Sequence, residues 1–592
     1  MIGQESRQEN NCDRSGNRVT IGGPDMKTQG MEKNVAEGLA ALERMEQASL
    51  SAPQIGLDTL MSLIRENENT EYGKKYDFRN IHSYADYASK VPFSEYQDYE
   101  PYIERMLVFG EKNLITASDV LYYAHTSGTS GASKMIPRTH RELEILYSDI
   151  FQRAFGLCEK EKAAGEKESA VGTEGRFSGR RGANFMETQI GFTSMGTPHG
   201  AISATLNHPV DTVPCSVFPE DIIYSTVDFD RRHVKLLFAL RDKHLSFLMS
   251  TFSPMIHDMI VYLQLHWQEL CGDLEAGRIG TEVSVDPRMR ARLNAILTPD
   301  PERAEEIRGI MQKYKDGDFI PRIWPDLKLV ACVGTATFAP HLEKIKEHLG
   351  PDIAVDQLGY VSSESTVAAQ IKEGEEAYML LPYSGFYEFI PMDGDSEAQE
   401  EVPVLMDQLE VGREYELIVT NLSGFYRYRI GDVIRVTGFH NKCPMIVFSY
   451  RKNQLVSMYG EKVTEAVMQS SVEKLSLESG TRIYEYSVYP DTDSDPGRYI
   501  VILESDEEIG PDRWQSYSDN LNRILCEAHD SYRAKMAGKI MLPLEVRFVQ
   551  PQTYALYRDM KIMDGASPNQ IKPLHVIANE KLKRFFFALV QR

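Results

Sequence analysis

The chain has 592 residues, with 65 Lys and Arg against 87 Asp and Glu, so its formal charge is −22. This length predicts several domains or a few large ones, which can fold without disulfides, and the acidic balance without a basic stripe excludes a general nucleic-acid binder. The seven cysteines lack zinc spacing and no run of 18 apolar residues occurs, so we expect free thiols, a reducing cytoplasmic location and no membrane contact.

Two polar stretches stand apart from the periodic parts of the chain. Residues 1–35 are rich in polar residues and Gly, and predict a disordered tail. Residues 159–182 mix charges of both signs with Gly, and predict a flexible insert on the surface.

A hydroxyl- and glycine-rich motif, TSGTSGASK, occupies residues 126–134. Its glycines let backbone N–H groups turn toward an anion, and Ser127, Thr129 and Ser130 add hydroxyl donors. The order of residues is not that of a Walker loop. The alternative interpretation is a flexible Ser/Gly surface loop, which is common.

A strand–helix–strand unit is predicted next. Ser253-Pro254 begins a long helix with apolar residues on one face. Further on, Pro340 begins a helix that Gly350 ends, between buried strands at 328–333 and 353–358. This pattern is typical of a βαβ unit in an α/β protein.

The motif GYVSSE follows the second of these strands, at residues 359–364. Open α/β sheets bind ligands at the carboxyl ends of their strands. Two hydroxyls and the Glu364 carboxylate there could hold a phosphate and its Mg²⁺. The alternative is a helix start, with a serine as N-cap and Glu364 in the first turn.

From Glu414 the pattern has period two, and short strands are predicted over EYELIVT, FYRYR and VIRVT. Alternation places Tyr426 and Tyr428 on one face, and Arg427 and Arg429 on the other. Asp432 follows a predicted Gly turn, where its carboxylate could accept both hydroxyls of a ribose. A plain hairpin turn is the alternative.

A domain boundary is predicted at about residue 452, followed by a smaller α/β domain over 452–592. It should contain a helix at 461–477, strands over YEYSVY and RYIVIL, a helix at 512–534 and the strand LEVRFV. Lys462 opens the first helix, and Lys572 lies in a loop bracketed by prolines. Composition alone would class such lysines as solvated surface residues.

Taken in order, these motifs resemble one family. TSGTSGASK is similar to the phosphate loop of the adenylate-forming, firefly-luciferase-like superfamily. GYVSSE, YMLLPYSGFYEFIP, EYELIVTNLSGFYRYRIGDVIRVTGF and the late NQIKP resemble the Gretchen Hagen acyl-acid amido synthetases, over residues 68–580. The resemblance implies an α/β fold with a large N-terminal domain (36–451) of β-sheets flanked by helices with a small β-barrel, and a mobile C-terminal lid domain (452–592).

The resemblance also implies a reaction and its residues. Mg-ATP would adenylate a small carboxylic acid, and an amine or amino acid would then displace AMP to form an amide. The implied roles are phosphate binding by Ser127, Thr129 and Ser130, adenine contact by Gly334 and Thr335, nucleotide binding by Tyr360, α-phosphate contact by Ser363, Mg²⁺ binding by Glu364, ribose binding by Asp432, and contact with the phosphate or acyl oxygen by Lys462 and Lys572.

Two other functions remain open from the sequence. The same adenylation step could serve an acyl-CoA or carrier-protein thioester ligase, or the chain could be a non-catalytic nucleotide-binding relative. We expect a monomer that acts on small molecules.

Overall fold

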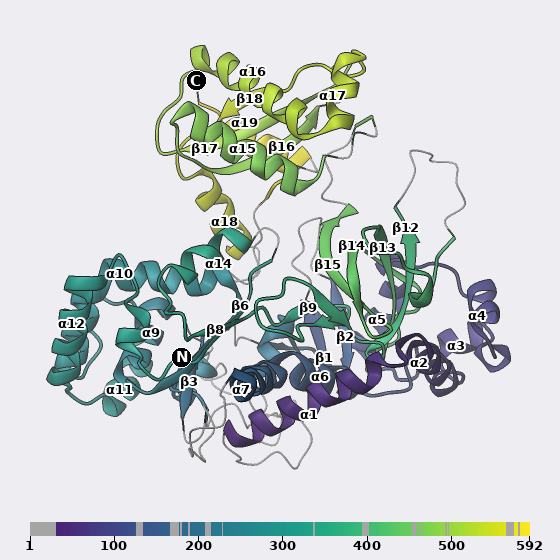
Figure 1. The fold of residues 1–592 in the computed structure, drawn as a ribbon, viewed down its shortest axis with the longest axis horizontal. Coiled ribbons are helices and arrows are strands. Elements are labelled where there is room, and N and C mark those ends of the chain that lie inside the picture. Colours follow the sequence, from purple (N-terminus) through teal and green to yellow (C-terminus); the bar gives the residue numbers. More distant parts are fainter. Residues whose placement is uncertain are drawn as a thin grey trace, which may run out of the picture.

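The computed structural model describes residues 31–591, apart from 126–133, 166–176, 178–179, 187–189, 208–214, 226, 228, 336–337, 393–401, 453–457, 460, 462, 492–493, 495, 564–573 and 578–579. A large lobe holds everything up to β15, and a smaller C-terminal lobe lies above it (Figure 1). The α/β fold class predicted from the sequence is therefore confirmed.

One half of the large lobe is built on a parallel sheet of order β3-β6-β7-β8. Phe247 and Met249 of β6 face the main core, whereas Leu248 faces a second core formed by helices. Apolar residues on both faces are expected of a parallel sheet covered on both sides. The elements here are α7 (Arg153–Gly165), β3 (Arg181–Asn184), α8 (Glu220–Ile223), α9 (Arg231–Arg241), β6 (Leu245–Phe252), α10 (Ser253–Ala276), α11 (Pro287–Ile296), α12 (Pro301–Tyr314), α13 (Ile320–Ile323), β7 (Leu329–Val333), α14 (Ala339–Lys346) and β8 (Ala354–Asp356).

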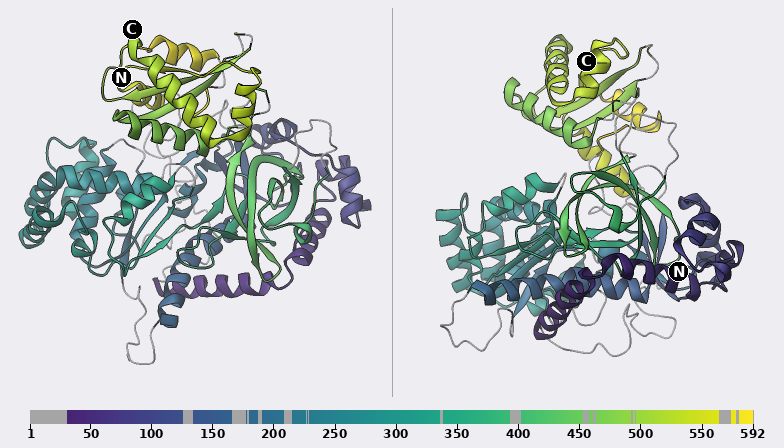
Figure 2. Two further views of the ribbon diagram at one scale, coloured as in Figure 1. Left: turned by 45° about the horizontal axis from the view of Figure 1, so that its top comes forward. Right: turned by 45° about the vertical axis from the view of Figure 1, so that its right-hand side comes forward.

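The other half contains a seven-stranded antiparallel sheet of order β12-β13-β14-β15-β11-β10-β9. This sheet curls strongly (Figure 2), but its edge strands β12 and β9 form no ladder in the described part of the chain, so the predicted small barrel is an open one. Its strands are β9 (Gly359–Val361), β10 (Thr366–Ala369), β11 (Tyr378–Leu380), β12 (Gly385–Pro391), β13 (Glu414–Asn421), β14 (Tyr428–His440) and β15 (Cys443–Arg451), with the short helix η5 (Met406–Gln408) after β12.

A four-stranded sheet, β2-β1-β5-β4, and the N-terminal helices complete the large lobe. Ser94 forms a bridge with Tyr428, which ties the N-terminal helices to β14. The elements are α1 (Met31–Ser49), α2 (Ala52–Glu66), α3 (Glu71–Lys75), η1 (Phe78–Asn80), α4 (Tyr84–Lys90), α5 (Tyr96–Phe109), β1 (Val120–His125), β2 (Met135–Thr139), α6 (His140–Ile145), the π-helix η2 (Leu146–Gln152), β4 (Ile190–Phe192), β5 (Pro198–Gly200) and η3 (Ile202–Asn207).

Helix α1 spans the underside of the large lobe (Figure 2). Its C-terminal end contacts the β14–β15 hairpin, where Asn441 Nδ2 donates to Ser49 Oγ at 2.8 Å and Lys442 N donates to the Ser49 carbonyl at 3.0 Å. Helix α1, the first helix in the described part of the chain, is thus bound to the β14–β15 hairpin.

The C-terminal lobe has a three-stranded sheet of order β16-β17-β18, in which β17 and β18 are parallel. Its apolar residues form two cores of their own. Its elements are α15 (Glu465–Ser479), β16 (Ile483–Asp491), β17 (Arg498–Ser505), α16 (Pro511–Ala528), α17 (Asp530–Ala537), β18 (Glu545–Phe548), α18 (Thr553–Met563) and α19 (Glu580–Ala588).

Several local expectations need correction. Residues 31–35, assigned to the tail, form the first turns of α1, and residues 159–165, assigned to the insert, extend α7. Helix α14 ends at Lys346, before Gly350, and the helix expected at 512–534 is two helices, α16 and α17. The remaining tail and most of the insert lie outside the described residues.

The largest correction concerns the predicted Gly-Asp turn. Gly431 and Asp432 lie inside β14, where the register shifts between Glu416 and Ile418 of the partner strand, so they form a bulge rather than a turn. Gly431 has a φ of +80°, which glycine adopts without strain.

No helix in the described ranges is long and apolar enough to cross a membrane.

Candidate functional site: the Tyr360–Asp432 cluster

Two of the predicted motifs meet through a side-chain hydrogen bond. The hydroxyl of Tyr360, on β9, donates to Asp432 Oδ2, on β14, at 2.5 Å. Three strands separate β9 from β14 in the sheet order, so this contact is possible only because the sheet curls until its two halves face each other. The curl therefore brings together motifs that are 72 positions apart.

Asp432 is almost fully buried, and both of its oxygens are engaged. Arg451 Nε donates to Oδ1 at 2.5 Å, and Asp432 is 1% exposed. Burial opposes the Arg451 charge, but the Asp432 carboxylate more than offsets this and raises the pKa of Arg451 above its ordinary value. Burial and the same carboxylate raise the pKa of Tyr360 well above 10. Tyr360 therefore stays a protonated donor at neutral pH.

Arg451 was missed as a site residue, although the sequence holds a signal for it. The β14–β15 hairpin turns at Asn441 and Lys442, and Asn441 has a φ of +53°. Counting outward from this two-residue turn places Asp432 opposite Arg451, and the observed register agrees because its two shifts between the turn and this pair cancel.

The Ser-Ser-Glu segment forms a tight turn between β9 and β10. Ser362 Oγ accepts hydrogen bonds from the backbone N–H of Glu364 at 3.2 Å and of Ser365 at 3.0 Å. The residues that follow form β10, so the alternative of a helix start is wrong. A hydroxyl that accepts from N–H groups two and three positions on is a common way to close such a turn.

Ser363 lies beside the end of β1. Its hydroxyl donates to the carbonyl of His125 at 2.8 Å. His125 is the last described residue before the hydroxyl- and glycine-rich motif. The ring of His125 contacts that of His199 on β5, where Nε2 of His125 lies 2.9 Å from Nδ1 of His199. Burial lowers the pKa of His125 to about 4. This histidine is therefore neutral at physiological pH.

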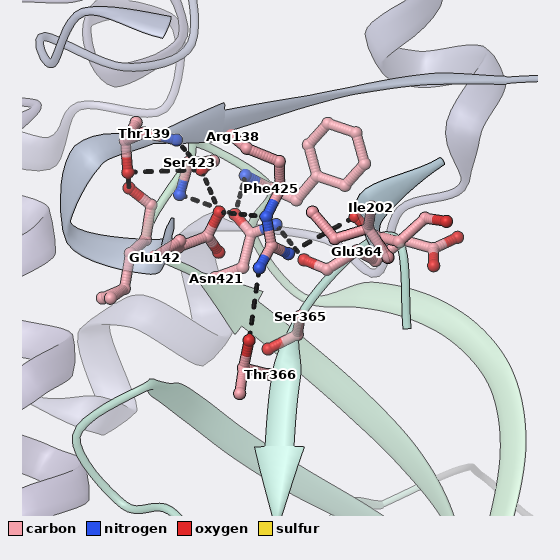
Figure 3. Close-up of polar contacts among 12 residues, drawn as sticks. Arg138, Thr139, Glu142, Ile202, Glu364, Ser365, Thr366, Asn421, Ser423 and Phe425 are labelled. Atoms are coloured by element: carbon pink, nitrogen blue, oxygen red, sulfur yellow. Dashed lines mark hydrogen bonds and ion pairs between the residues drawn. The ribbon is translucent and has the colours of Figure 1, made fainter. Parts of the chain in front are cut away.

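Glu364 has a buried backbone and an uncommitted carboxylate. The residue is 8% exposed, and its carbonyl accepts from Asn421 Nδ2 at 2.7 Å. Its carboxylate makes no hydrogen bond or ion pair with any residue that the structure describes, and it points away from Arg138 (Figure 3). Its charge contributes to the raised pKa values of Tyr360 and Arg451, so it lies within electrostatic reach of the Asp432 cluster.

Gly334 and Thr335 follow β7 directly. A Cβ on Gly334 would lie 2.4 Å from Leu342 Cδ2, so the close approach of α14 requires glycine here. Thr335 forms a hydrogen bond with Tyr378. Burial raises the pKa of Tyr378 to about 12, and this hydrogen bond partly offsets the rise. Among the described residues, no hydrogen bond joins Thr335 to Asp432 or Glu364.

Five predicted site residues lie outside the described residues: Ser127, Thr129, Ser130, Lys462 and Lys572. Glu461, next to Lys462, accepts from the backbone N–H of Met458 and Tyr459, both at 2.8 Å. Within the described ranges, no group of three or more His, Cys, Asp or Glu side chains could hold a metal ion.

Comparison with solved structures assigns the fold. A structure named GH3.15 acyl acid amido synthetase matches with a TM-score of 0.77 and 24% identity, over 94% of this chain and 97% of that one. The chain therefore has the same fold as that structure.

Models of the GH3 family match three consecutive segments: the N-terminal domain over 41–354, the central domain over 378–451 and the C-terminal domain over 461–581. Probable indole-3-acetic acid-amido synthetase GH3.1 of Arabidopsis thaliana is 30% identical over 90% of both chains. Jasmonoyl--L-amino acid synthetase JAR4 of Nicotiana attenuata is 26% identical, over 90% of this chain and 92% of its own. The chain belongs to the GH3 family, as the sequence motifs predicted.

Proposed function

We propose that this protein is an ATP-dependent ligase that adenylates a small carboxylic acid and transfers the acyl group to an amine or amino acid. The observation that best supports the proposal is the hydrogen bond between Tyr360, which precedes the Ser-Ser-Glu turn, and the late aspartate, Asp432. Membership of the GH3 family, whose relatives named above are amido synthetases, supports the same reaction.

The chemistry proceeds in two displacements. A carboxylate oxygen attacks the α-phosphorus of ATP, the bond to the bridging oxygen breaks, and pyrophosphate leaves. The amine nitrogen then attacks the acyl carbon, the bond to the AMP oxygen breaks, and the nitrogen loses its proton. Because the first step brings two anions together, positioning and charge neutralisation supply most of the catalysis.

The described residues would bind the nucleotide in this reaction. Asp432 would accept the ribose hydroxyls, held by Tyr360 and Arg451, which occupy one lone pair on each carboxylate oxygen. Ser363 would contact the α-phosphate. Its hydroxyl now donates to His125, so as a donor to phosphate it must first turn away from that carbonyl.

The remaining assignments rest on matched motifs. Gly334 and Thr335 would contact the adenine. Ser127, Thr129 and Ser130 would bind the phosphates, and Lys462 and Lys572 would reach the phosphate or acyl oxygen from the C-terminal lobe.

The residues present fit a magnesium ion bound together with ATP. Mg²⁺ is usually held by one or two carboxylates and by substrate phosphates rather than by a full protein cage. Glu364 offers one carboxylate that no described residue engages. When bound, the ion would neutralise phosphate charge, while Glu364 holds it in place.

The proposal is tested with purified full-length protein. Pyrophosphate exchange in the presence of Mg-ATP, across aryl, fatty, hormone-like and polyketide acids, should identify the acid. Asp432→Asn should slow exchange by about 10- to 100-fold, because hydrogen bonds to a charged group contribute about 1.5–3 kcal/mol. The proposal fails if no acid supports exchange.

The acceptor is tested separately by mass spectrometry of the products. With the active acid, we expect an amide with one or more amino acids and no thioester when coenzyme A is supplied instead. A thioester in place of the amide would assign the chain to the ligases that use a thiol. We also propose that the protein acts as a cytoplasmic monomer; the free thiols of Cys158, Cys215, Cys271, Cys332, Cys443 and Cys526 agree with a reducing compartment.

A further inference from the structure

A buried polar cluster lies next to the Ser-Ser-Glu turn, and the proposed chemistry does not use it. Arg138 at the end of β2 is 0% exposed, and Glu142 of α6 is 2% exposed. Asn421, at the end of β13, and Ser423 complete the cluster and are equally buried. Figure 3 shows these side chains packed around one another, directly above the start of β10.

The cluster holds two consecutive carbonyl groups of the turn. Arg138 Nη1 donates to the Ser363 carbonyl at 3.4 Å, and Asn421 Nδ2 donates to the Glu364 carbonyl at 2.7 Å. Arg138 Nη2 also donates to Thr366 Oγ1 at 3.2 Å, where β10 begins. The orientations of the peptide groups around Glu364 are therefore fixed by side chains from two other elements.

The cluster is a costly way to fill a core. Arg138 Nε lies 3.3 Å from Glu142 Oε2, yet Arg138 Nε and Glu142 Oε1 have no hydrogen-bond partner within the described part of the chain. Burial raises the pKa of Glu142, against the opposing charge of Arg138. Apolar residues of similar volume often stabilise a core at least as well as a buried ion pair. Contribution to stability alone therefore does not account for Arg138.

We propose that Arg138 is a positioning residue, which holds the turn so that the Glu364 carboxylate faces the Mg²⁺ of Mg-ATP. This inference rests on the proposed function and deepens it. Outer groups that orient a metal ligand typically change metal affinity 10- to 100-fold when they are removed. We expect a similar effect here, without a change in the acid that is used.

The test compares Arg138→Met, Arg138→Lys and Asn421→Asp with the wild-type protein. The aspartate keeps the acceptor for the N–H groups of Ser423 and Phe425 but loses the donor to the Glu364 carbonyl. Arg303→Lys is the matched control, because Arg303 is a buried arginine that donates to the carbonyls of Leu240 and Ile323 in the helical half of the lobe.

Two measurements decide the inference. Pyrophosphate exchange at fixed ATP gives the Mg²⁺ concentration for half-maximal rate, and Mn²⁺ titration by electron paramagnetic resonance gives metal affinity in the presence of ATP without turnover. Arg138→Met and Asn421→Asp should each weaken metal binding at least about tenfold, Arg138→Lys should recover part of it, and Arg303→Lys should leave it unchanged.

The inference is overturned if folded Arg138→Met and Asn421→Asp proteins bind the metal as the wild type does, or if Arg303→Lys weakens binding equally. Should Arg138→Met fail to fold, Asn421→Asp and Arg138→Lys decide the result. Wild-type protein that binds Mn²⁺ with ATP but exchanges no pyrophosphate would refute the proposed function alone. Wild-type protein that binds no Mn²⁺ with ATP would refute both.

Discussion

Tyr360 donates to Asp432 across the interior of a curled sheet, at 2.5 Å, although the two residues belong to strands that are not neighbours. Neither residue would be positioned by its own strand alone. The geometry of the site is therefore a property of the sheet's curvature, and changes to either partner should affect nucleotide binding before they affect folding.

Tyr360→Phe should raise the KM for ATP by roughly 10- to 150-fold, because the loss of one hydrogen bond to a charged carboxylate costs about 1.5–3 kcal/mol. Steady-state pyrophosphate exchange measures the effect. Tyr554→Phe is the matched control, since Tyr554 is a buried tyrosine of the C-terminal lobe that donates to Ser487 Oγ at 2.8 Å. An unchanged KM in Tyr360→Phe would contradict a role for the Tyr360–Asp432 bond in nucleotide binding.

Glu364→Gln should separate function from stability. Because no described residue engages the buried carboxylate, and a neutral amide costs less to bury than an unpaired charge, we expect the free energy of unfolding not to fall. The Mg²⁺ requirement of pyrophosphate exchange should rise by at least about tenfold. The exposed Glu376 provides the control variant Glu376→Gln. A large loss of stability in Glu364→Gln, with unchanged Mg²⁺ dependence, would make Glu364 a structural residue.

Asp356→Asn should destabilise the large lobe. Arg153 is fully buried and donates to Asp356 at 2.5 and 3.0 Å, and it also donates to the Leu358 carbonyl. Leu358 has a φ of +60°, a conformation that is strained for leucine. Removing one charge of such a buried pair costs about 3–5 kcal/mol.

Urea denaturation, followed by circular dichroism, measures the effect of Asp356→Asn. The control is Asp77→Asn, which removes an exposed partner of Lys90 and should cause no measurable loss. Equal stability of the Asp356→Asn and wild-type proteins would show that the buried pair contributes nothing net.

The C-terminal lobe should lose stability as the pH rises, through Glu485. Burial, assisted by the charge of Glu504 and opposed by Arg558, raises the pKa of Glu485 to about 7. The folded state then binds the proton more tightly than the unfolded state, whose glutamates titrate near 4.3, so stability falls between these two pKa values. Glu485→Gln removes this pH dependence. The free energy of unfolding of the variant, relative to that of the wild type, should therefore rise by on the order of 2 kcal/mol between pH 5 and pH 8.

Hydrogen exchange of β16 and β17, corrected for intrinsic rates, reports this local stability. Glu527→Gln is the control: the ion pairs of Glu527 lower its pKa, so its contribution is already constant above pH 5. A constant difference between Glu485→Gln and wild type across this range would refute the assignment.

Local features of the fold could be predicted from the sequence, because their signals lie within a few residues. Pro340 and the flanking apolar runs predict the β7–α14–β8 unit, which the structure contains. The turn predicted at the Gly431-Asp432 dipeptide was wrong, because the same two residues suit both a hairpin turn and a β-bulge. Only the pairing with β13 decides between them.

The supporting residues of the site could not be predicted in the same way. Arg138 lies in an ordinary strand sequence, and its partner Ser363 is 225 positions away. Arg427 was predicted to alternate along a strand, but it has a φ of +47° and pairs with Glu388, 39 positions away. Such roles arise only when distant segments meet, and no local pattern carries them.

The attachment of α1 to the β14–β15 hairpin has a consequence for the newly made chain. Asn441 and Ser49 are 392 positions apart. At a synthesis rate of about 5–20 residues per second, the C-terminal end of α1 waits roughly 20–80 seconds for the hairpin to leave the ribosome. The large lobe can therefore complete its packing only late in translation, although most of α1 packs against η2 and α7, which leave the ribosome much earlier.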